Sequence, residues 1–282
     1  MTTPPKQPVT GWQRDLVIRI DRGIYWFSKH WLAIFNAVIA LYVGLPILAP
    51  VLMHAGITGP ATTIYTLYKP MCHQMASRSF FLFGEQYAYP RTLAETELQP
   101  LESYTNTLPE FAGVEADNWV EFLYAARLFV GNEQLGYKMA LCERDIAIYG
   151  FVLVGGLVYA ILRLRFRVKP LSFLLFLLIG VGPIAFDGFS QLFSYYGTPI
   201  PGLPTEGFGA NLQAWLRSIF PLRESTPMLR TLTGALFGFS LVWLSYPHID
   251  AGMQGTEQDL AQKLQRAEAR GKNEEREKNE EA

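Results

Sequence analysis

The chain has 282 residues and a formal net charge of -1, with 17% charged and 14% aromatic residues. Soluble domains carry roughly 25% charged residues, so the composition favours a membrane protein. The near-neutral charge argues against a nucleic-acid partner. The sequence has no phosphate loop, dinucleotide fingerprint or H-E-x-x-H zinc helix.

Residues 1–30 are polar and charged, and they include Arg14, Arg19, Arg22 and Lys29. A signal peptide would need a compact apolar core followed by a small-residue cleavage site, and neither is found there. We therefore expect a cytoplasmic or interfacial segment, followed by an uncleaved membrane anchor.

Four apolar stretches are long enough to cross a membrane, because a hydrocarbon core about 30 Å thick needs roughly 20 helical residues. The first stretch covers residues 31–53. The other three lie within residues 145–247, at 146–162, 171–193 and 232–246. The sequence therefore predicts an all-α membrane protein with about four transmembrane helices.

The loop between the second and third spans carries four cations and no acid: Arg163, Arg165, Arg167 and Lys169. Short loops rich in Lys and Arg stay in the cytoplasm. By alternation, both termini are cytoplasmic and residues 54–144 and 197–228 are external. We expect a multi-pass protein of the cell membrane.

The external segment 54–144 holds both cysteines and is too long to be structureless. Residues 118–130 have helical periodicity. The apolar stripe of this expected helix consists of Trp119, Phe122, Leu123, Ala126 and Phe129. We expect a small, partly helical external cap between the first and second spans.

The second external segment, 197–228, is rich in Gly and in prolines such as Pro199, Pro201 and Pro204. It reads as a loop around one short helix at 211–219.

Residues 248–282 form a charged cytoplasmic tail, with a helix-capping pattern from Thr256 to Asp259. Two interpretations remain open for this tail. It is either a solvated helix or a helix that docks on a cytoplasmic partner.

Polar residues gather at the external ends of the predicted spans. Asp187 comes about sixteen residues into its span, roughly 24 Å along the helix axis, and Gln191 shares its face. An ionisable group at this depth indicates a functional site. The expected partners are Arg78, Arg144 and Arg230, with Glu224 in the same cluster. The alternative is a structural ion pair, or a carboxyl group that reaches the outer interface.

Cys72 and Cys142 leave three alternatives open. An oxidising exterior favours a disulfide. A metal site for zinc or another divalent metal would use Cys72, His73, Cys142 and Asp145. The third alternative is an inert or catalytic thiol.

Several of these residues fall in short motifs that resemble a known family. The motifs are Cys72-His73-Gln74 with Arg78-Ser79, Cys142-Glu143-Arg144, Asp187-Gly188 with Gln191, and Arg223-Glu224-Ser225-Thr226 with Arg230. They resemble the prokaryotic membrane-protein family known as domain of unknown function 2085, from Pro70 to Gly238. The resemblance implies a polytopic membrane protein and brings no reaction with it. The chain departs from the family in having Asp145 where members commonly have a second Cys, and in its long insertion at 86–140.

Two functions fit these observations. In the first, the cluster acts on a lipid or lipid-linked substrate, with Asp187 as general base or metal ligand and the three arginines binding an anionic head group. In the second, the chain is a non-catalytic structural or assembly subunit of a membrane complex, with the cap and tail as docking surfaces. A transporter is a third hypothesis, but four spans leave one chain little room for a transport pathway.

Overall fold

The computed structural model describes residues 11–115, 118–198 and 206–280. The expectations for residues 1–10 and for Pro199, Pro201 and Pro204 therefore lie outside the described residues. The α-helices are α1 (Trp12–His54), α2 (Thr58–Tyr68), α3 (Trp119–Leu128), α4 (Glu143–Leu162), α5 (Phe173–Leu175), α6 (Gly182–Tyr196), α7 (Phe208–Ile219) and α8 (Pro227–Glu280). The strands are β1 (Phe81–Leu82), β2 (Gly131–Asn132) and β3 (Gly136–Lys138).

Shorter helical turns complete the described elements. The 3-10 turns are η1 (Ala76–Arg78), η2 (Thr92–Ala94), η3 (Leu101–Ser103), η4 (Thr105–Thr107) and η5 (Pro109–Phe111), and η6 (Phe176–Val181) is a π-helical turn.

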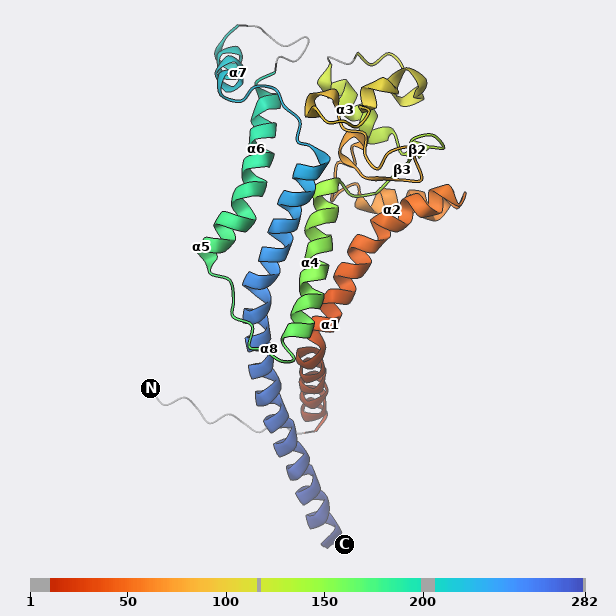
Figure 1. The fold of residues 1–282 in the computed structure, drawn as a ribbon. Coiled ribbons are helices and arrows are strands. Elements are labelled where there is room, and N and C mark those ends of the chain that lie inside the picture. The colour runs from red at the N-terminus through yellow and green to blue at the C-terminus, as the bar shows by residue number, and fades with distance from the viewer. Residues whose placement is uncertain (1–10, 116–117, 199–205, 281–282) are drawn as a thin grey trace. The chain divides into compact units, whose positions relative to one another are not determined.

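Four helical segments are long and apolar enough to cross a membrane, as the sequence predicts. They are Trp12–His54, Glu143–Leu162, Phe173–Tyr196 and Pro227–Asn273. The all-α membrane fold is thus confirmed. The third segment runs through α5, η6 and α6 without interruption (Figure 1).

The chain divides into two compact units. One combines α1 up to Phe35 with α8 from Ser245 onward, and the other is Asn36–Leu244. All candidate site residues belong to the second unit.

In the first unit, the beginning of α1 and the charged part of α8 pair in antiparallel order. Lys263 Nζ lies 2.7 Å from Asp21 Oδ2, and Trp31 Nε1 donates to Asp250 Oδ1 at 3.2 Å. These contacts explain why α1 begins at Trp12 instead of at residue 31: charged residues that cannot enter a bilayer find partners on α8.

The charged tail of α8 is correspondingly not a separate helix. The predicted helix start at Thr256 is wrong, because α8 continues through it and Thr256 Oγ1 donates to Gly252 O at 3.0 Å.

In the second unit, glycines let α4 and α8 approach each other closely (Figure 1). A Cβ added at Gly238 would lie 2.2 Å from Ile148 O, and one at Gly234 would lie 2.7 Å from Arg144 O. Small residues at helix contacts are typical of membrane bundles, where close packing replaces the hydrophobic effect. The start of α4, which carries Arg144, is thereby held against α8.

Prolines free three helix carbonyls, and each of them finds a donor from another segment. Proline has no N–H, so the carbonyl four residues earlier loses its usual partner. The carbonyls freed by Pro46, Pro50 and Pro247 belong to Tyr42, Pro46 and Trp243. They accept from Tyr68 Oη at 2.7 Å, Ala140 N at 3.2 Å and Leu171 N at 2.9 Å, respectively. The first two bonds tie α2 and the segment before α4 to α1.

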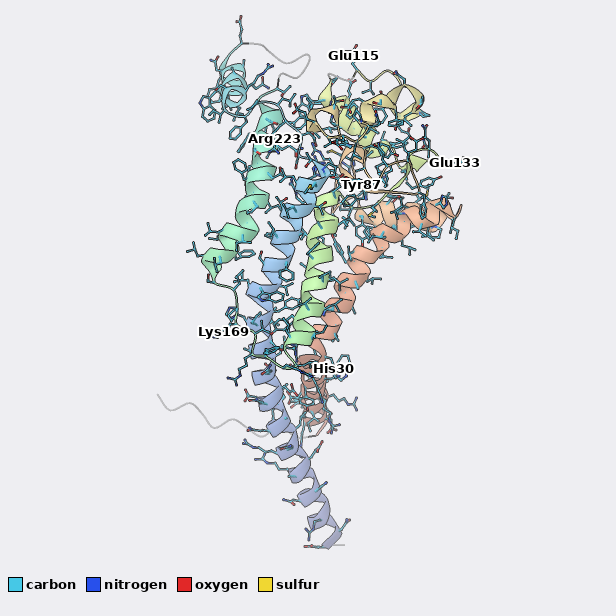
Figure 2. The ribbon with its side chains drawn as sticks, in the orientation of Figure 1. His30, Tyr87, Glu115, Glu133, Lys169 and Arg223 are labelled. Atoms are coloured by element: carbon cyan, nitrogen blue, oxygen red, sulfur yellow. The ribbon has the colours of Figure 1, made fainter. Side chains whose placement is uncertain are left out.

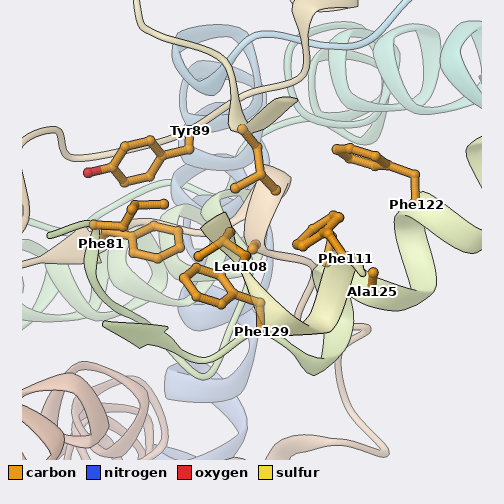
Figure 3. Packing of buried hydrophobic residues seen from close by; sticks show 11 residues of the cluster. Phe81, Tyr89, Leu108, Phe111, Phe122, Ala125 and Phe129 are labelled. Carbon is orange, nitrogen blue, oxygen red and sulfur yellow. The ribbon is translucent and has the colours of Figure 1, made fainter. Parts of the chain in front are cut away.

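The cap has a hydrophobic core of its own (Figure 3). The predicted cap helix is present as α3, and Asn118 caps it by accepting from Glu121 N at 3.4 Å. Its buried stripe packs against η5 and η1. A small antiparallel sheet in the order β1-β3-β2, in which Phe81 pairs with Lys138, completes the cap. The core comprises Ala76, Phe81, Tyr89, Leu101, Leu108, Phe111, Phe122, Ala125, Ala126, Phe129 and Leu135.

Candidate functional site

The buried face of α6 is polar and its exposed face is apolar. Its buried residues are Asp187, Ser190, Gln191, Ser194 and Tyr195, whereas Phe186, Phe189 and Leu192 are exposed. A membrane-spanning helix turns its apolar side chains toward lipid, so its polar groups must find partners inside the protein. This polar face is where the residues of the sequence motifs meet.

Asp187 is buried and accepts from three side chains. Arg144 Nη2 and Ser225 Oγ both donate to Oδ2, the latter at 2.8 Å, and Arg223 Nη2 donates to Oδ1 at 3.0 Å. Of the expected partners, the structure brings Arg144 to Asp187, while Arg78 and Arg230 contact a different carboxylate. With donors on both oxygens, Asp187 orients the guanidinium groups of Arg144 and Arg223.

Glu224 is the second carboxylate of the network. It accepts from both Arg78 Nε at 2.7 Å and Gln191 Nε2 at 2.8 Å through Oε1, and also from Arg230 and Tyr195. Burial alone would raise the pKa of Glu224, but the cations Arg78 and Arg230 outweigh it and hold the pKa below its usual range. Glu224 therefore stays ionised and fixes two arginines at once.

Arg230 links this carboxylate to a third one. Its Nη1 lies 3.2 Å from Glu143 Oε2, and both side chains are almost fully buried. Glu143 Oε1 and Arg144 Nε, in contrast, are buried without a hydrogen-bond partner among the described residues. Unpaired buried polar atoms are costly, and they are common where a ligand or water completes a site.

Three cations of this network, Arg78, Arg144 and Arg223, are more accessible than the carboxylates they contact, whereas Arg230 is buried. The side chains of Arg144 and Arg223 are 22% and 32% exposed, whereas Asp187 is 2% exposed. The same holds for Arg78 at 25% and Glu224 at 0%. An entering ligand would therefore meet guanidinium groups first.

The two cysteines and Asp145 form a second cluster beside the arginines. The side-chain donor atoms of Cys72, Cys142 and Asp145 all lie within 4.8 Å of one another, and Cys142 Sγ is 3.2 Å from Asp145 Oδ2. Both thiols are free, so the disulfide alternative is not realised in the described structure. His73 is exposed and lies outside this group, although it lines the adjoining cavity.

Cys72 lies in a tightly held turn. Its sulfur accepts from Gln74 N at 3.4 Å and from Cys142 N at 3.3 Å. The Cys142 side chain and these backbone donors hold the pKa of the Cys72 thiol below its usual value, while Cys72 and burial raise the pKa of Cys142. The turn needs a left-handed backbone at Gln74, where φ is 53°.

Lys138 of β3 stabilises the turn from within the cap. Its Nζ donates to Gln74 O at 2.5 Å and to Arg127 O at 2.8 Å, and the side chain is 1% exposed. Burial lowers the pKa of Lys138 to about 7. The cap thus fixes the position of the Cys72 turn.

Two hollows meet at this network. A cavity of about 300 Å³ is lined by Met71, Cys72, His73, Gln74, Met75, Arg78, Cys142, Arg144, Asp145, Gln191 and Arg230. An apolar groove of about 680 Å³ between α6, the end of α7 and α8 is lined by Pro183, Phe186, Asp187, Ser190, Ile219, Phe220, Pro221, Arg223, Leu229 and Thr233. The Arg144–Asp187 pair joins the two, because Arg144 lines the cavity and Asp187 the groove. Figure 2 labels Arg223 at this end of the helices and Lys169 at the other end.

Comparison with known proteins supports the family suggested by the motifs. The model of the family described as "Predicted membrane protein (DUF2085)" matches residues 133–244. The resemblance is confirmed over these residues. The DUF2085 match includes the motifs at Cys142, Asp187 and Glu224, while Cys72 and most of the cap precede it.

One relative extends the similarity beyond the DUF2085 match. An uncharacterised protein of Methanocaldococcus jannaschii is 24% identical over 227 residues, which are 78% of this chain and 92% of the relative. No solved structure matches the chain.

The site residues expected from sequence did not include five members of the network, namely Glu143, Ser190, Tyr195, Arg223 and Ser225. Arg223 and Ser225 flank Glu224 in a recognised motif, and Ser190 and Tyr195 follow Asp187 at helical spacing. Helical spacing therefore carried the signal for the α6 residues. Residues 223–225 lie in an irregular segment, so no periodicity predicts which way each of their side chains points.

Proposed function

We propose that this membrane protein binds a lipid or lipid-linked substrate with an anionic head group at the predicted outer boundary, and acts on it there. The observation that carries the proposal is the set of partly exposed guanidinium groups paired with buried carboxylates. Arg78, Arg144 and Arg223 offer donors to an anion. Glu224 holds Arg78 in place, and Asp187 holds Arg144 and Arg223.

The apolar groove supports an amphiphile over a water-soluble anion. Its apolar wall of Phe186, Ile219 and Leu229 adjoins Arg223, so a tail in the groove would bring a head group to the arginines. Phe186 is 77% exposed and belongs to a predicted span. The groove would therefore open directly to lipid.

Helix α7 supports lateral access from the membrane. Phe208, Leu212, Trp215 and Ile219 form one exposed apolar stripe on it, and α7 has no buried residue. A short helix with a marked apolar face and a polar opposite face fits the membrane interface. Ile219, at its end, lines the groove.

The proposal is tested with protein reconstituted in vesicles that contain a phosphatidic acid carrying a photoreactive tail. We expect cross-links in peptides containing Phe186 or Ile219, and stronger capture than with the matching phosphatidylcholine. Ile219→Trp should fill the groove and reduce capture several-fold, while Leu212→Trp on the same helix should not. Equal capture of both lipids by all three proteins would contradict the proposal.

Turnover is measured in the same vesicles as a change in mass of the captured lipid.

A second candidate, a structural or assembly subunit, is favoured by the pairing of Arg78, Arg144 and Arg230 with carboxylates. Unchanged lipid mass together with no effect of Arg223→Gln on capture would favour this second candidate, because Arg223 is the arginine that lines the groove.

A further inference from the structure

The cluster of Cys72, Cys142 and Asp145 has the composition of a metal site. We propose that these three residues bind a borderline-soft divalent cation such as Zn²⁺, with a fourth coordination position open to the cavity. The assignment differs from the ligand set expected from sequence, because it excludes His73. Its three ligands take no part in the lipid proposal, so the two proposals are tested separately.

The three donor atoms are close to the spacing that a shared cation requires. Zinc binds thiolate sulfur at about 2.3 Å and carboxylate oxygen at about 2.0–2.2 Å, which places tetrahedral ligand atoms roughly 3.5–3.8 Å apart. The observed atoms all lie within 4.8 Å of one another, and Cys142 Sγ and Asp145 Oδ2 are 3.2 Å apart. Small side-chain rotations therefore suffice to bring them around one ion.

The backbone around Cys72 is arranged for a thiolate. Its sulfur accepts from the N–H groups of Gln74 and Cys142, and such donors favour the charged form that binds metals. Cys142 precedes α4 and Asp145 lies in its first turn, where the helix dipole favours negative ligands. Two segments that lie 70 residues apart in the chain thus present anionic donors to one point.

The turn that carries Cys72 is rigid, as a metal site needs. Cys72 N donates to Tyr68 O at 3.0 Å, and Gln74 Nε2 donates to Tyr65 O at 2.8 Å. Lys138 holds Gln74 O from the other side. Because these bonds fix the backbone, the Cys72 sulfur is oriented toward α4 before any ion arrives.

The cavity supplies the open position. All three ligands line it, together with Arg144 and Arg230. Three protein ligands with one open position are typical of catalytic zinc, whereas structural zinc has four protein ligands. Two thiolates and a carboxylate would leave a divalent ion with one excess negative charge, which the nearby Arg144 guanidinium offsets. The site would therefore polarise a molecule held in the cavity.

The experiment uses the reduced full-length protein in detergent, loaded with Co²⁺ as a spectroscopic substitute for Zn²⁺. The chain has only two cysteines, so a thiolate-to-cobalt charge-transfer band can come only from this site. We expect one equivalent of Co²⁺ to produce the band and Zn²⁺ to displace it. Cys72→Ser and Cys142→Ser should each weaken or shift the band.

Two further variants separate the ligands from their neighbours. Asp145→Ala should weaken Zn²⁺ binding more than about tenfold, and Asp145→Cys should intensify the charge-transfer band by adding a third thiolate. His73→Ala is the matched control and should leave the Zn²⁺ affinity and the charge-transfer band unchanged. Ile219→Trp, which blocks the lipid groove, should also leave the band unchanged, so the two proposals fail separately.

The proposal is overturned if the folded, reduced protein with two titratable thiols gives no band. It is also overturned if His73→Ala abolishes the band while Asp145→Ala does not. Retention of the fold by the variants, checked by thermal unfolding, excludes loss of structure as the cause.

Discussion

Arg144 and Asp187 form an ion pair between α4 and α6, and this pair lies where the polar cavity meets the apolar groove. Arg144 comes from the second predicted span and Asp187 from the third. Asp187 also accepts from Arg223 and Ser225, so a carboxylate that is held in place joins the two spans.

Asp187→Asn should destabilise the protein, because Arg144 and Arg223 would lose their counter-charge. Breaking a buried ion pair costs about 3–5 kcal/mol, and we expect the low end because both arginines are partly exposed. Thermal unfolding in detergent measures the effect. Asp259→Asn in the exposed part of α8 is the control and should leave the melting temperature unchanged.

The same variant separates the two proposed roles of the network. Loss of lipid turnover per folded molecule, measured beside the melting temperature, would identify an active site. A lowered melting temperature with normal turnover of the folded fraction would identify a structural one.

Lys138 should give the protein a pH-dependent stability. Its folded pKa of about 7 lies below the unfolded value near 10.4, so between these values the unfolded state binds more protons and stability rises with pH. The free energy of unfolding should increase by up to about 1.4 kcal/mol per pH unit. The stabilisation is fully present above pH about 10.4 and is lost as the pH falls toward 7.

Thermal unfolding at pH 7, 8 and 9 tests this dependence. The increase in melting temperature with pH should be smaller in Lys138→Met. Lys169→Met, in the exposed loop, should behave like the unmodified chain. Identical pH profiles for all three proteins would show that Lys138 stays protonated throughout.

Gly238→Ala should separate α4 from α8. The added Cβ would lie 2.2 Å from Ile148 O, and overpacking of this kind costs about 1–3 kcal/mol. Gly252→Ala on the same helix meets no atom within 4 Å and should be neutral or slightly stabilising, because Ala is the better helix former. Thermal unfolding compares the two, and equal melting temperatures would contradict the close packing.

The predicted topology places the loop at 163–169 in the cytoplasm and the cap outside. A cysteine introduced at Arg165 should react with a membrane-impermeant maleimide only after the membrane is opened. One introduced at Glu133, in the exposed turn between β2 and β3, should react in intact cells. The reverse pattern would invert the orientation of the whole chain.

The spans could be predicted from sequence because membrane crossing depends on apolar length, which is local. The meeting of Cys72 and Cys142 could be expected because each flanks the cap at the predicted outer boundary and each begins a motif. The contact of Asp187 with Arg144 followed from the cost of an isolated charge in hydrocarbon.

Features that depend on distant partners could not be predicted in the same way. The helical extension of α1 back to Trp12 is stabilised by α8, and nothing in residues 12–30 alone indicates that partner. The assignment of Arg78 and Arg230 to Glu224 rather than to Asp187 depends on side-chain directions in irregular segments. Strand β3 was hidden because it is three residues long.

Pro46 leaves the carbonyl of Tyr42 without its helical donor, and Tyr68 Oη donates to it instead. This replacement makes residues 46 and 68 depend on each other. Tyr68 supplies the hydroxyl that this carbonyl needs only as long as residue 46 is a proline. A lineage that replaces the proline restores the helical N–H, and a phenylalanine at position 68 then costs nothing. In relatives, the two positions should therefore change together, although 22 residues separate them and neither belongs to the proposed site.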